Sequence, residues 1–124
     1  MAIGWTGVQR VTVDGVLARF PPDSGRCADA ARAIVPIARD VDPTARGRLI
    51  QPDPVLAPRA RFVVPKRCRL SASWFHHVTV EAAGHCVDVL TGPDGCEVAS
   101  YLDAHFEYAD VLRVDEVDLS REDL

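Results

Sequence analysis

The sequence lacks any long apolar run, and no stretch approaches the roughly 18 apolar residues that a membrane-spanning helix needs. Its first residues, MAIGWTGVQRVTVDG, lack the charged start and the apolar block of a signal peptide. We therefore expect a protein that is made in the cytoplasm and has no membrane partner.

Metal-ligand spacings are missing as well. The four cysteines are scattered across 70 residues, and the chain has neither a C-x2-C nor an H-x3-H pair. Thiols also persist in a reducing cytosol, so we expect free cysteines and not disulfides. The sequence thus predicts no structural metal and no cofactor.

The length leaves no room for a second domain, so residues 1–124 are expected to form one domain. With 48% hydrophobic and 26% charged residues, the composition is that of a globule able to bury a core. A net charge of −4 argues against a dedicated nucleic-acid binder, and we expect no nucleic-acid partner.

Charge is distributed unevenly along the chain. Residues 1–70 carry 12 basic and 6 acidic side chains, whereas residues 71–124 carry 2 basic and 12 acidic ones. Either the basic stretch 46–69 and the acidic tail lie on neighbouring solvated faces, or the basic stretch binds an anionic partner.

The first expected element is a β-hairpin. Two strand-like runs, 11–13 and 16–18, flank Asp14-Gly15, which is a strong signal for a two-residue turn. Pro21-Pro22 then ends the hairpin.

The one clear helix is the Ala-rich segment SGRCADAARAIVPIARDV, which runs to about Val41 with Asp23 or Ser24 as its N-cap. Pro36 is expected to kink or interrupt this helix. Apolar residues at spacings of three and four predict a buried stripe made of Cys27, Ala31, Ile34, Ala38 and Val41.

The rest of the chain predicts an antiparallel sheet. Four prolines make 42–60 a long irregular loop, and 98–108 reads as a short helix or an extended piece. The acidic tail is expected to fray. Strands are predicted at 61–64, 70–81, 86–91 and 111–114, with a hairpin turn at 82–85. The sum is an α+β fold in which an N-terminal helix packs on an antiparallel sheet.

A cysteine in the first turn of this helix is a candidate nucleophile. With Ser24 as the cap, Cys27 falls at the third helical position, where unpaired N–H groups and the positive end of the dipole favour the thiolate. A nucleophilic thiol also needs a base and a third group that orients the base.

Strand alternation selects the base. Stacking the strand valines on one core side pairs Val80 with Val87, which puts His77 on the same face as Asp88, as its diagonal neighbour. The side chain of His76 then lies on the same face of the strand as the valines. A register slip of one residue would place His76 and not His77 on the face of Asp88. The pattern therefore favours His77 over His76 only if Val80 pairs with Val87.

The segments Gly25-x-Cys27-x-x-Ala30 and HHVTVEAAGHCVDVLTG resemble the papain-like and transglutaminase-like cysteine enzymes, especially the compact papain-fold domains of bacterial toxins. The resemblance implies a papain-like minimal core with Cys27 as nucleophile, His77 as base and Asp88 as the group that orients the base. It implies hydrolase or acyl-transfer chemistry on a protein or peptide amide through a thioester, as in a thiol protease, amidase, deamidase or transglutaminase.

Two residue patterns depart from that family. Ala28 stands where an aromatic often follows the nucleophile, and the family's glutamine before the cysteine is missing, since Gln9 and Gln51 are the only glutamines. An oxyanion hole would therefore come mainly from backbone N–H groups. A toxin or effector domain would further imply secretion or delivery from its producer, with a cognate inhibitor or a delivery protein as partner.

The competing interpretation assigns no chemistry to these residues. A cysteine on an Ala-rich helix is commonly a small core residue. The chain would then be a catalytically silent α+β module that binds an acidic protein through residues 46–69. In both interpretations the remaining cysteines and histidines pack or lie on the surface without a role: Cys68, Cys86, Cys96, His85 and His105.

Overall fold

The computed structural model describes residues 3–66 and 74–124. The helices are α1 (Gly7–Arg19), α2 (Cys27–Ala38) and α3 (Val98–His105), with short 3-10 turns η1 (Pro22–Ser24) and η2 (Ala109–Val111). The strands are β1 (Arg46–Pro52), β2 (His77–Ala82), β3 (His85–Val87), β4 (Cys96–Glu97) and β5 (Leu112–Glu116). The predicted α+β class is confirmed.

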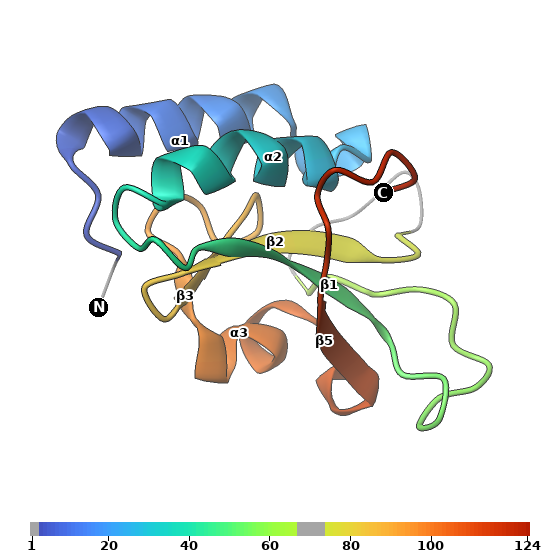
Figure 1. The fold of residues 1–124 in the computed structure, drawn as a ribbon. Coiled ribbons are helices and arrows are strands. Elements are labelled where there is room, and N and C mark those ends of the chain that lie inside the picture. The colour runs from blue at the N-terminus through green and yellow to red at the C-terminus, as the bar shows by residue number, and fades with distance from the viewer. Residues whose placement is uncertain (1–2, 67–73) are drawn as a thin grey trace.

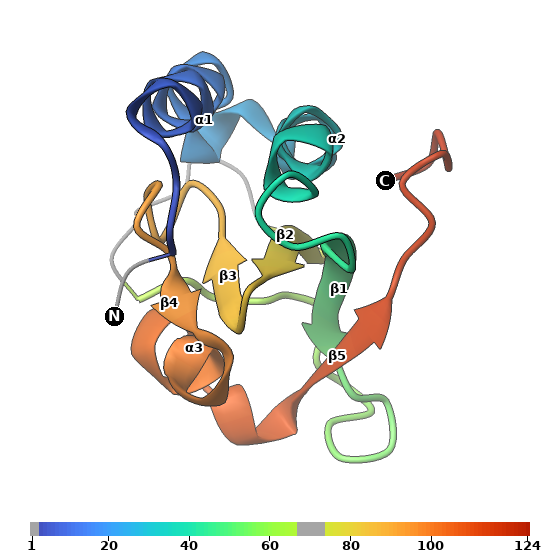
Figure 2. The same cartoon turned by 60° about the vertical axis from the view of Figure 1, so that its left-hand side comes forward.

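The five strands form one antiparallel sheet in the order β4-β3-β2-β1-β5. Helices α1 and α2 cover one face of this sheet, and α3 lies on the other face (Figures 1 and 2). Each face has its own apolar core: Val78 and Val80 belong to the core under α2, and Tyr101 and Phe106 belong to the core beside α3. No helix among the described residues is both long and apolar enough to cross a membrane.

The predicted hairpin at 11–18 is wrong, because the whole segment lies in α1. Thr6 caps this helix through a capping box with Gln9, in which each side chain accepts from the other residue's backbone N–H. The apolar residues that looked like strand alternation also fit a helical face, with Val13, Val16 and Leu17 buried. The cap and this buried face outweigh the Asp-Gly turn signal.

Helix α2 starts later than the predicted caps. Asp23 and Ser24 lie in η1, Gly25 turns the chain in the left-handed region at φ 67°, and Arg26 is the N-cap. The Ser24 hydroxyl accepts from Arg26 N–H instead of from the helix. Cys27 is therefore the first residue of α2 and not the third.

Pro36 does not interrupt α2, which continues to Ala38. The proline lies in the last turn and is exposed, so the missing N–H bond falls near the point where the helix ends anyway. The buried face of α2 consists of Ala28, Ala30, Ala31, Ile34, Val35 and Ala38.

The segment 42–60 is not one long loop, because it contains β1, which lies between β2 and β5. Three of the prolines that suggested a loop lie outside the strand, and Pro52 is its last residue. The predicted strand 61–64 reduces to a bridge between Val63 and Trp74.

The later strands differ mainly in length. Of the predicted strand 70–81, the part before Trp74 lies outside the described residues, and β2 begins at His77. β3 ends at Val87, four residues before the end of the predicted strand. The segment 98–108 contains α3, and the predicted strand 111–114 is β5.

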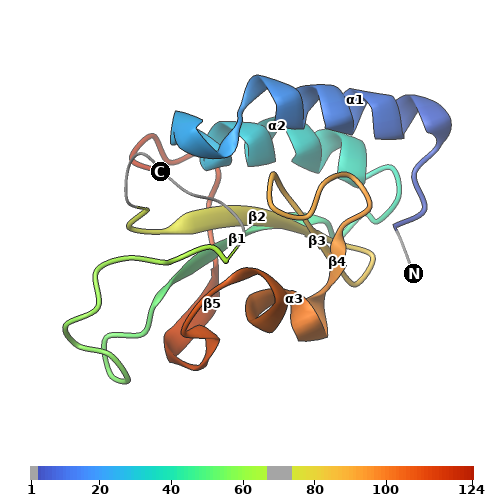
Figure 3. The ribbon, with the colours of Figure 1, turned by 180° about the vertical axis from the view of Figure 1, so that it is seen from behind.

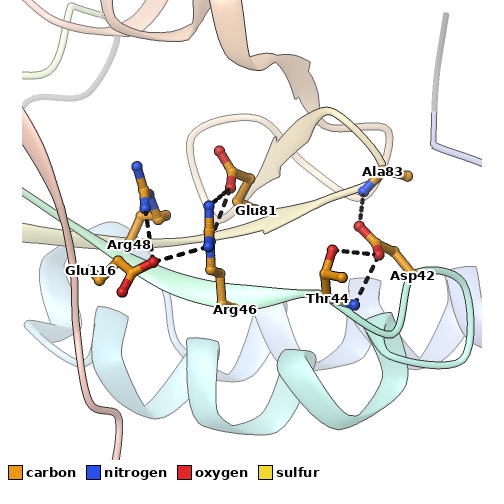
Figure 4. A network of polar contacts seen from close by, with 7 residues as sticks. All are labelled: Asp42, Thr44, Arg46, Arg48, Glu81, Ala83 and Glu116. Carbon is orange, nitrogen blue, oxygen red and sulfur yellow. Dashed lines mark hydrogen bonds and ion pairs between the residues drawn. The ribbon is translucent and has the colours of Figure 1, made fainter.

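The basic stretch meets acidic residues of the same molecule (Figure 4). The Arg46 guanidinium bridges Glu81 (3.1 Å) and Glu116 (2.9 Å), and Arg48 lies 3.9 Å from Glu116. Two of the arginines in 46–69 are thus paired internally, as in the first interpretation of the charge distribution. Arg67, Cys68 and Arg69 lie outside the described residues.

The acidic tail is not frayed. From β5 the chain returns over α2, where Arg32 donates from Nε to the Leu119 carbonyl at 2.6 Å (Figure 3). Val117 and Leu119 also pack against the core under α2.

Candidate functional site

The structure brings together the three residues singled out from the sequence. Cys27 is the first residue of α2, His77 is the first residue of β2, and Asp88 directly follows β3. Helix α2 and strand β2 start at the same end of the molecule, on the right of Figure 1. The thiol of Cys27, from the helix layer, interacts with the imidazole of His77, from the sheet.

The predicted hairpin register is confirmed. Val80 pairs with Val87, and the turn between β2 and β3 consists of Ala83 and Gly84, both with positive φ. His77 Nε2 lies 3.1 Å from Asp88 Oδ2, which is the diagonal contact that this register requires. The other residue that the sequence left open, His76, is partly buried and lies on the rim beside Cys27.

The imidazole of His77 is fully buried, and two aromatic rings lie against it. Trp74 stacks on it with a centroid separation of 4.7 Å and an interplanar angle of 7°, and Phe106 lies 5.9 Å away. With Nε2 held by Asp88, the other ring nitrogen, Nδ1, is buried and makes no standard hydrogen bond with any described residue. Nδ1 is therefore the ring nitrogen that Asp88 leaves for the interaction of His77 with Cys27.

Asp88 is held by several donors at once. One carboxylate oxygen, Oδ1, accepts from the backbone N–H groups of Leu90 (2.8 Å) and Thr91 (3.1 Å). The other, Oδ2, faces His77 and also accepts from the Tyr101 hydroxyl. A buried carboxylate with this many donors has a fixed orientation and stays ionised.

Asp88 and His77 stabilise each other's charged forms. Burial lowers the pKa of His77, but the hydrogen bond and charge of Asp88, followed by the interaction with Cys27, outweigh it and raise that pKa to about 9. Burial raises the pKa of Asp88, but His77, Thr79 and Tyr101 outweigh it and lower that pKa to about 2. The pair is an imidazolium and a carboxylate near neutral pH.

The Cys27 thiol is biased toward the thiolate. Burial alone raises its pKa, but the interaction with His77 and the backbone N–H groups of Val78 and Ala28 outweigh it, so the pKa is lowered. The first N–H groups of α2 and the helix dipole act in the same direction. The thiol of Cys86 shows the contrast, because burial and nearby carboxylates raise its pKa to about 12.

The sulfur is accessible from a pocket. Cys27 is partly exposed and lines a cavity of about 150 Å³ together with Gly25, Trp74, Phe75, His76 and Leu124. A ligand can therefore approach the thiol from solvent while the imidazole behind it stays dry.

Two residues of the site were not found from the sequence. Tyr101 belongs to the segment whose helical or extended state was left open, and nothing local indicates that its hydroxyl reaches Asp88. Trp74 lies three residues before His77, but only the folded chain stacks its ring on the imidazole. Both contacts depend on tertiary packing, for which a single sequence gives no signal.

The described residues that were expected to have no role are not among those that line the pocket at Cys27. Cys86 is buried, Cys96 is partly exposed, and both are free thiols, as is Cys27. His85 Nδ1 lies 2.9 Å from the Ala83 carbonyl at the hairpin turn, and His105 packs against Tyr101. The part of the chain that the structure describes holds no group of three or more His, Cys, Asp or Glu side chains suited to a metal.

Tyr101→Phe tests the support of the carboxylate. Because a hydrogen bond to a charged group contributes about 1.5–3 kcal/mol, we expect a loss of that size in the free energy of unfolding. Urea denaturation measures it. Tyr108→Phe changes an exposed tyrosine and serves as the matched control, with an expected change within about 0.5 kcal/mol. Equal effects of the two variants would contradict the role given to the Tyr101 hydroxyl.

No family model, curated protein or solved structure matches the chain. The resemblance to papain-like enzymes therefore stays a prediction from the sequence motifs. What the site can do follows from the geometry of Cys27, His77 and Asp88.

Proposed function

We propose that the protein is a cysteine-dependent hydrolase or acyl-transfer enzyme that acts on a protein or peptide amide. One observation carries the proposal: a fully buried imidazole lies between an ionised carboxylate and a partly exposed thiol at a helix start. Cys27 is the nucleophile, His77 is the general acid and base, and Asp88 orients His77.

The reaction has two steps. The Cys27 sulfur attacks the amide carbonyl carbon, the C–N bond breaks, and the proton that His77 holds goes to the leaving amine. This leaves a thioester on Cys27 and a neutral His77. In the second step His77 takes a proton from water or from an acceptor amine, which attacks the thioester and regenerates the thiolate and the imidazolium.

The negative oxygen that forms during attack needs hydrogen-bond donors. The start of α2 supplies backbone N–H groups that have no partner within the helix, and the macrodipole adds partial positive charge there. This arrangement agrees with the expectation that the backbone provides the oxyanion hole in a chain without the family's glutamine.

The burial of the charged pair argues for a function beyond packing. Burying an ion pair costs desolvation energy, and apolar residues of similar volume often stabilise a core equally well. Strongly shifted pKa values beside an accessible pocket are typical of functional sites. The alternative of a binding module through 46–69 loses part of its basic surface, because Arg46 forms internal ion pairs with Glu81 and Glu116, although Arg59 and Arg61 are exposed.

Thiol alkylation tests the activation of Cys27. Since the thiolate is the reactive form, we expect iodoacetamide at pH 6.5 to modify Cys27 at least about tenfold faster than Cys86 or Cys96. Peptide mass spectrometry resolves the sites, and the same reaction in concentrated urea, where the rates should converge, is the control. Equal rates in the folded protein would contradict the proposal.

The proposed reaction is tested directly with peptides that contain glutamine and asparagine. After incubation with the protein, cleavage of the peptide chain reports peptidase activity, and release of ammonia reports attack on a side-chain amide. Any activity should vanish in Cys27→Ala and persist in Cys96→Ala, which removes a thiol outside the site.

A further inference from the structure

Two cysteines outside the Cys27 site face each other across neighbouring strands. Cys86 of β3 and Cys96 of β4 are directly opposite in the antiparallel register, and both are free thiols. Directly opposite residues of an antiparallel pair carry their side chains on the same face of the sheet. Cys86 belongs to the apolar core beside α3, and Cys96 packs against that same core. The two thiols therefore lie side by side on one face.

The hydrogen bonds between the strands give the separation of the two backbones. Val98 N–H donates to the Gly84 carbonyl at 3.0 Å, so these two residues form a hydrogen-bonded pair of the ladder. Such pairs recur at every second position, which makes Cys86 and Cys96 a hydrogen-bonded pair as well, with α-carbons about 5.5 Å apart. That separation is close to the commonest one for α-carbons joined by a disulfide, roughly 5.5–6 Å.

Closing a disulfide here requires a movement of β4. The β-carbons of opposite residues lie up to about 5.5 Å apart, whereas a disulfide holds them about 3.8 Å apart. β4 consists of two residues at the edge of the sheet and leads directly into α3 (Figure 2). Gly95, at φ 74°, lets this strand approach β3 closely, since an added β-carbon would lie 3.1 Å from the Cys86 carbonyl oxygen. A short edge strand can therefore shift by the distance that is needed.

The two cysteines enclose the loop that holds Asp88. Residues 87–95 lie between them, and this loop supplies both backbone N–H groups that donate to the Asp88 carboxylate. The chain after Cys96 enters α3, whose Tyr101 hydroxyl donates to the same carboxylate. A bond between the two sulfurs would therefore join the two segments that orient Asp88.

We propose that Cys86 and Cys96 form an oxidation site, which closes to a disulfide between β3 and β4 in exchange with a low-molecular-weight disulfide. The Cys96 sulfur, which is partly exposed, attacks one sulfur of the small disulfide, and the S–S bond breaks. One small thiol leaves and takes up the Cys96 proton. The Cys86 sulfur then attacks the Cys96 sulfur, and the second small thiol leaves with the Cys86 proton. The protein dithiol loses two electrons, and the small disulfide is reduced to two thiols.

The environment of Cys86 makes the bond slow to form and slow to break. Burial, followed by the charges of Asp88, Glu81 and Cys96, raises the pKa of the Cys86 thiol to about 12. Little thiolate is then present at neutral pH, so the oxidation is best followed over hours at about pH 8.5. A reductant reaches the partly exposed Cys96 sulfur, and Cys86 must then depart as a thiolate of high pKa, which leaves slowly.

Redox equilibration of the full chain tests the site. In a Cys27→Ser and Cys68→Ser background, Cys86 and Cys96 are the remaining thiols. This chain is equilibrated with reduced and oxidised glutathione, folded in buffer and unfolded in concentrated urea, and free thiols are trapped with N-ethylmaleimide. The tryptic peptide 70–113 contains both cysteines, and mass spectrometry separates its dithiol, disulfide and glutathione-adduct forms. We expect the equilibrium constant for the disulfide to be at least about tenfold larger in the folded chain.

A stability measurement on the chain with its native cysteines is independent of those two substitutions. After oxidation by glutathione disulfide, the urea midpoint should lie at least about 0.7 M above that of the reduced chain, because the closed loop lowers the entropy of the unfolded state. Cys96→Ser cannot form the bond and is the matched control. Its midpoint should not rise on the same treatment.

The results bear on this site alone. A ratio of about tenfold or more, with a rise in midpoint that Cys96→Ser lacks, supports the oxidation site. A smaller ratio, glutathione adducts in place of the disulfide, or an equal rise in Cys96→Ser overturns it. Neither measurement depends on whether Cys27 attacks an amide, so the oxidation site and the proposed enzyme function succeed or fail separately.

Discussion

Asp88→Ala is expected to lower the free energy of unfolding by about 3–5 kcal/mol, because it leaves a buried cation and several buried donors without their acceptor. The groups affected are His77 Nε2, the Tyr101 hydroxyl and the N–H groups of Leu90 and Thr91. For a urea m-value near 2 kcal/mol/M, the midpoint should fall by about 2 M. Urea denaturation followed by circular dichroism measures the change.

Acid pH gives an independent check on the same carboxylate. The pKa of Asp88 is about 2 in the folded protein, below its ordinary value of 3.8, so its contribution is complete above about pH 4. That contribution, on the order of 2 kcal/mol, is lost as the pH falls from about 4 toward 2. The Asp88→Ala variant should lack this part of the acid transition.

Asp94→Ala is the matched control for Asp88→Ala. Asp94 pairs with Arg10 on the surface, where both side chains are about half exposed and the pair is screened by solvent, so the expected loss is small. A loss of that small size in Asp88→Ala as well would show that the buried groups around Asp88 do not depend on its carboxylate for stability.

His77→Gln is expected to raise the pKa of the Cys27 thiol above that of the native protein. The glutamine keeps a polar side chain but removes the positive charge, so burial, which raises the pKa of Cys27, is no longer outweighed. Each unit of this rise lowers the thiolate fraction tenfold, and we expect alkylation of Cys27 at pH 6 to slow by at least about tenfold. The pH profile of the alkylation rate, resolved by peptide, measures the shift.

The two neighbouring histidines are separated by the same experiment. In His76→Gln the profile should keep its low midpoint, because His76 has no contact with Asp88 of the kind that holds His77. His85→Gln, at the hairpin turn, controls for a general effect of losing an imidazole. If His76→Gln and not His77→Gln shifted the profile, the base would be the other histidine.

The site was predictable from the sequence because its parts depend on local rules. Strand alternation and stacking of the valines place His77 beside Asp88, and a two-residue turn at Ala83 and Gly84 fixes the register. The cysteine at a helix start follows from the Ala-rich segment after two prolines. That Cys27 meets His77 depends on how the helix layer lies on the sheet, and the only expectation for this contact came from the family resemblance.

The errors in the fold have physical reasons too. In 7–19, valines and an Asp-Gly pair favour strands locally, but the capping box at Thr6 and the buried face around Val16 favour the helix. In 42–60, prolines suggested a loop, yet they leave Arg46–Ile50 free to pair with β2 on one side. A local capping box together with burial decides the first segment, and pairing with strands distant in the sequence decides the second.

Cys27 and His77, the proposed nucleophile and general base, belong to different layers of the molecule. His77 and Asp88 lie on one hairpin and keep their mutual geometry as long as that hairpin is intact, whereas Cys27 arrives from α2. A small slide of the helix over the strands would change the sulfur-to-nitrogen separation and leave the hairpin undisturbed. The pKa and reactivity of the Cys27 thiol therefore depend on how α2 is aligned with the sheet. Any contact that moves α2 would change them.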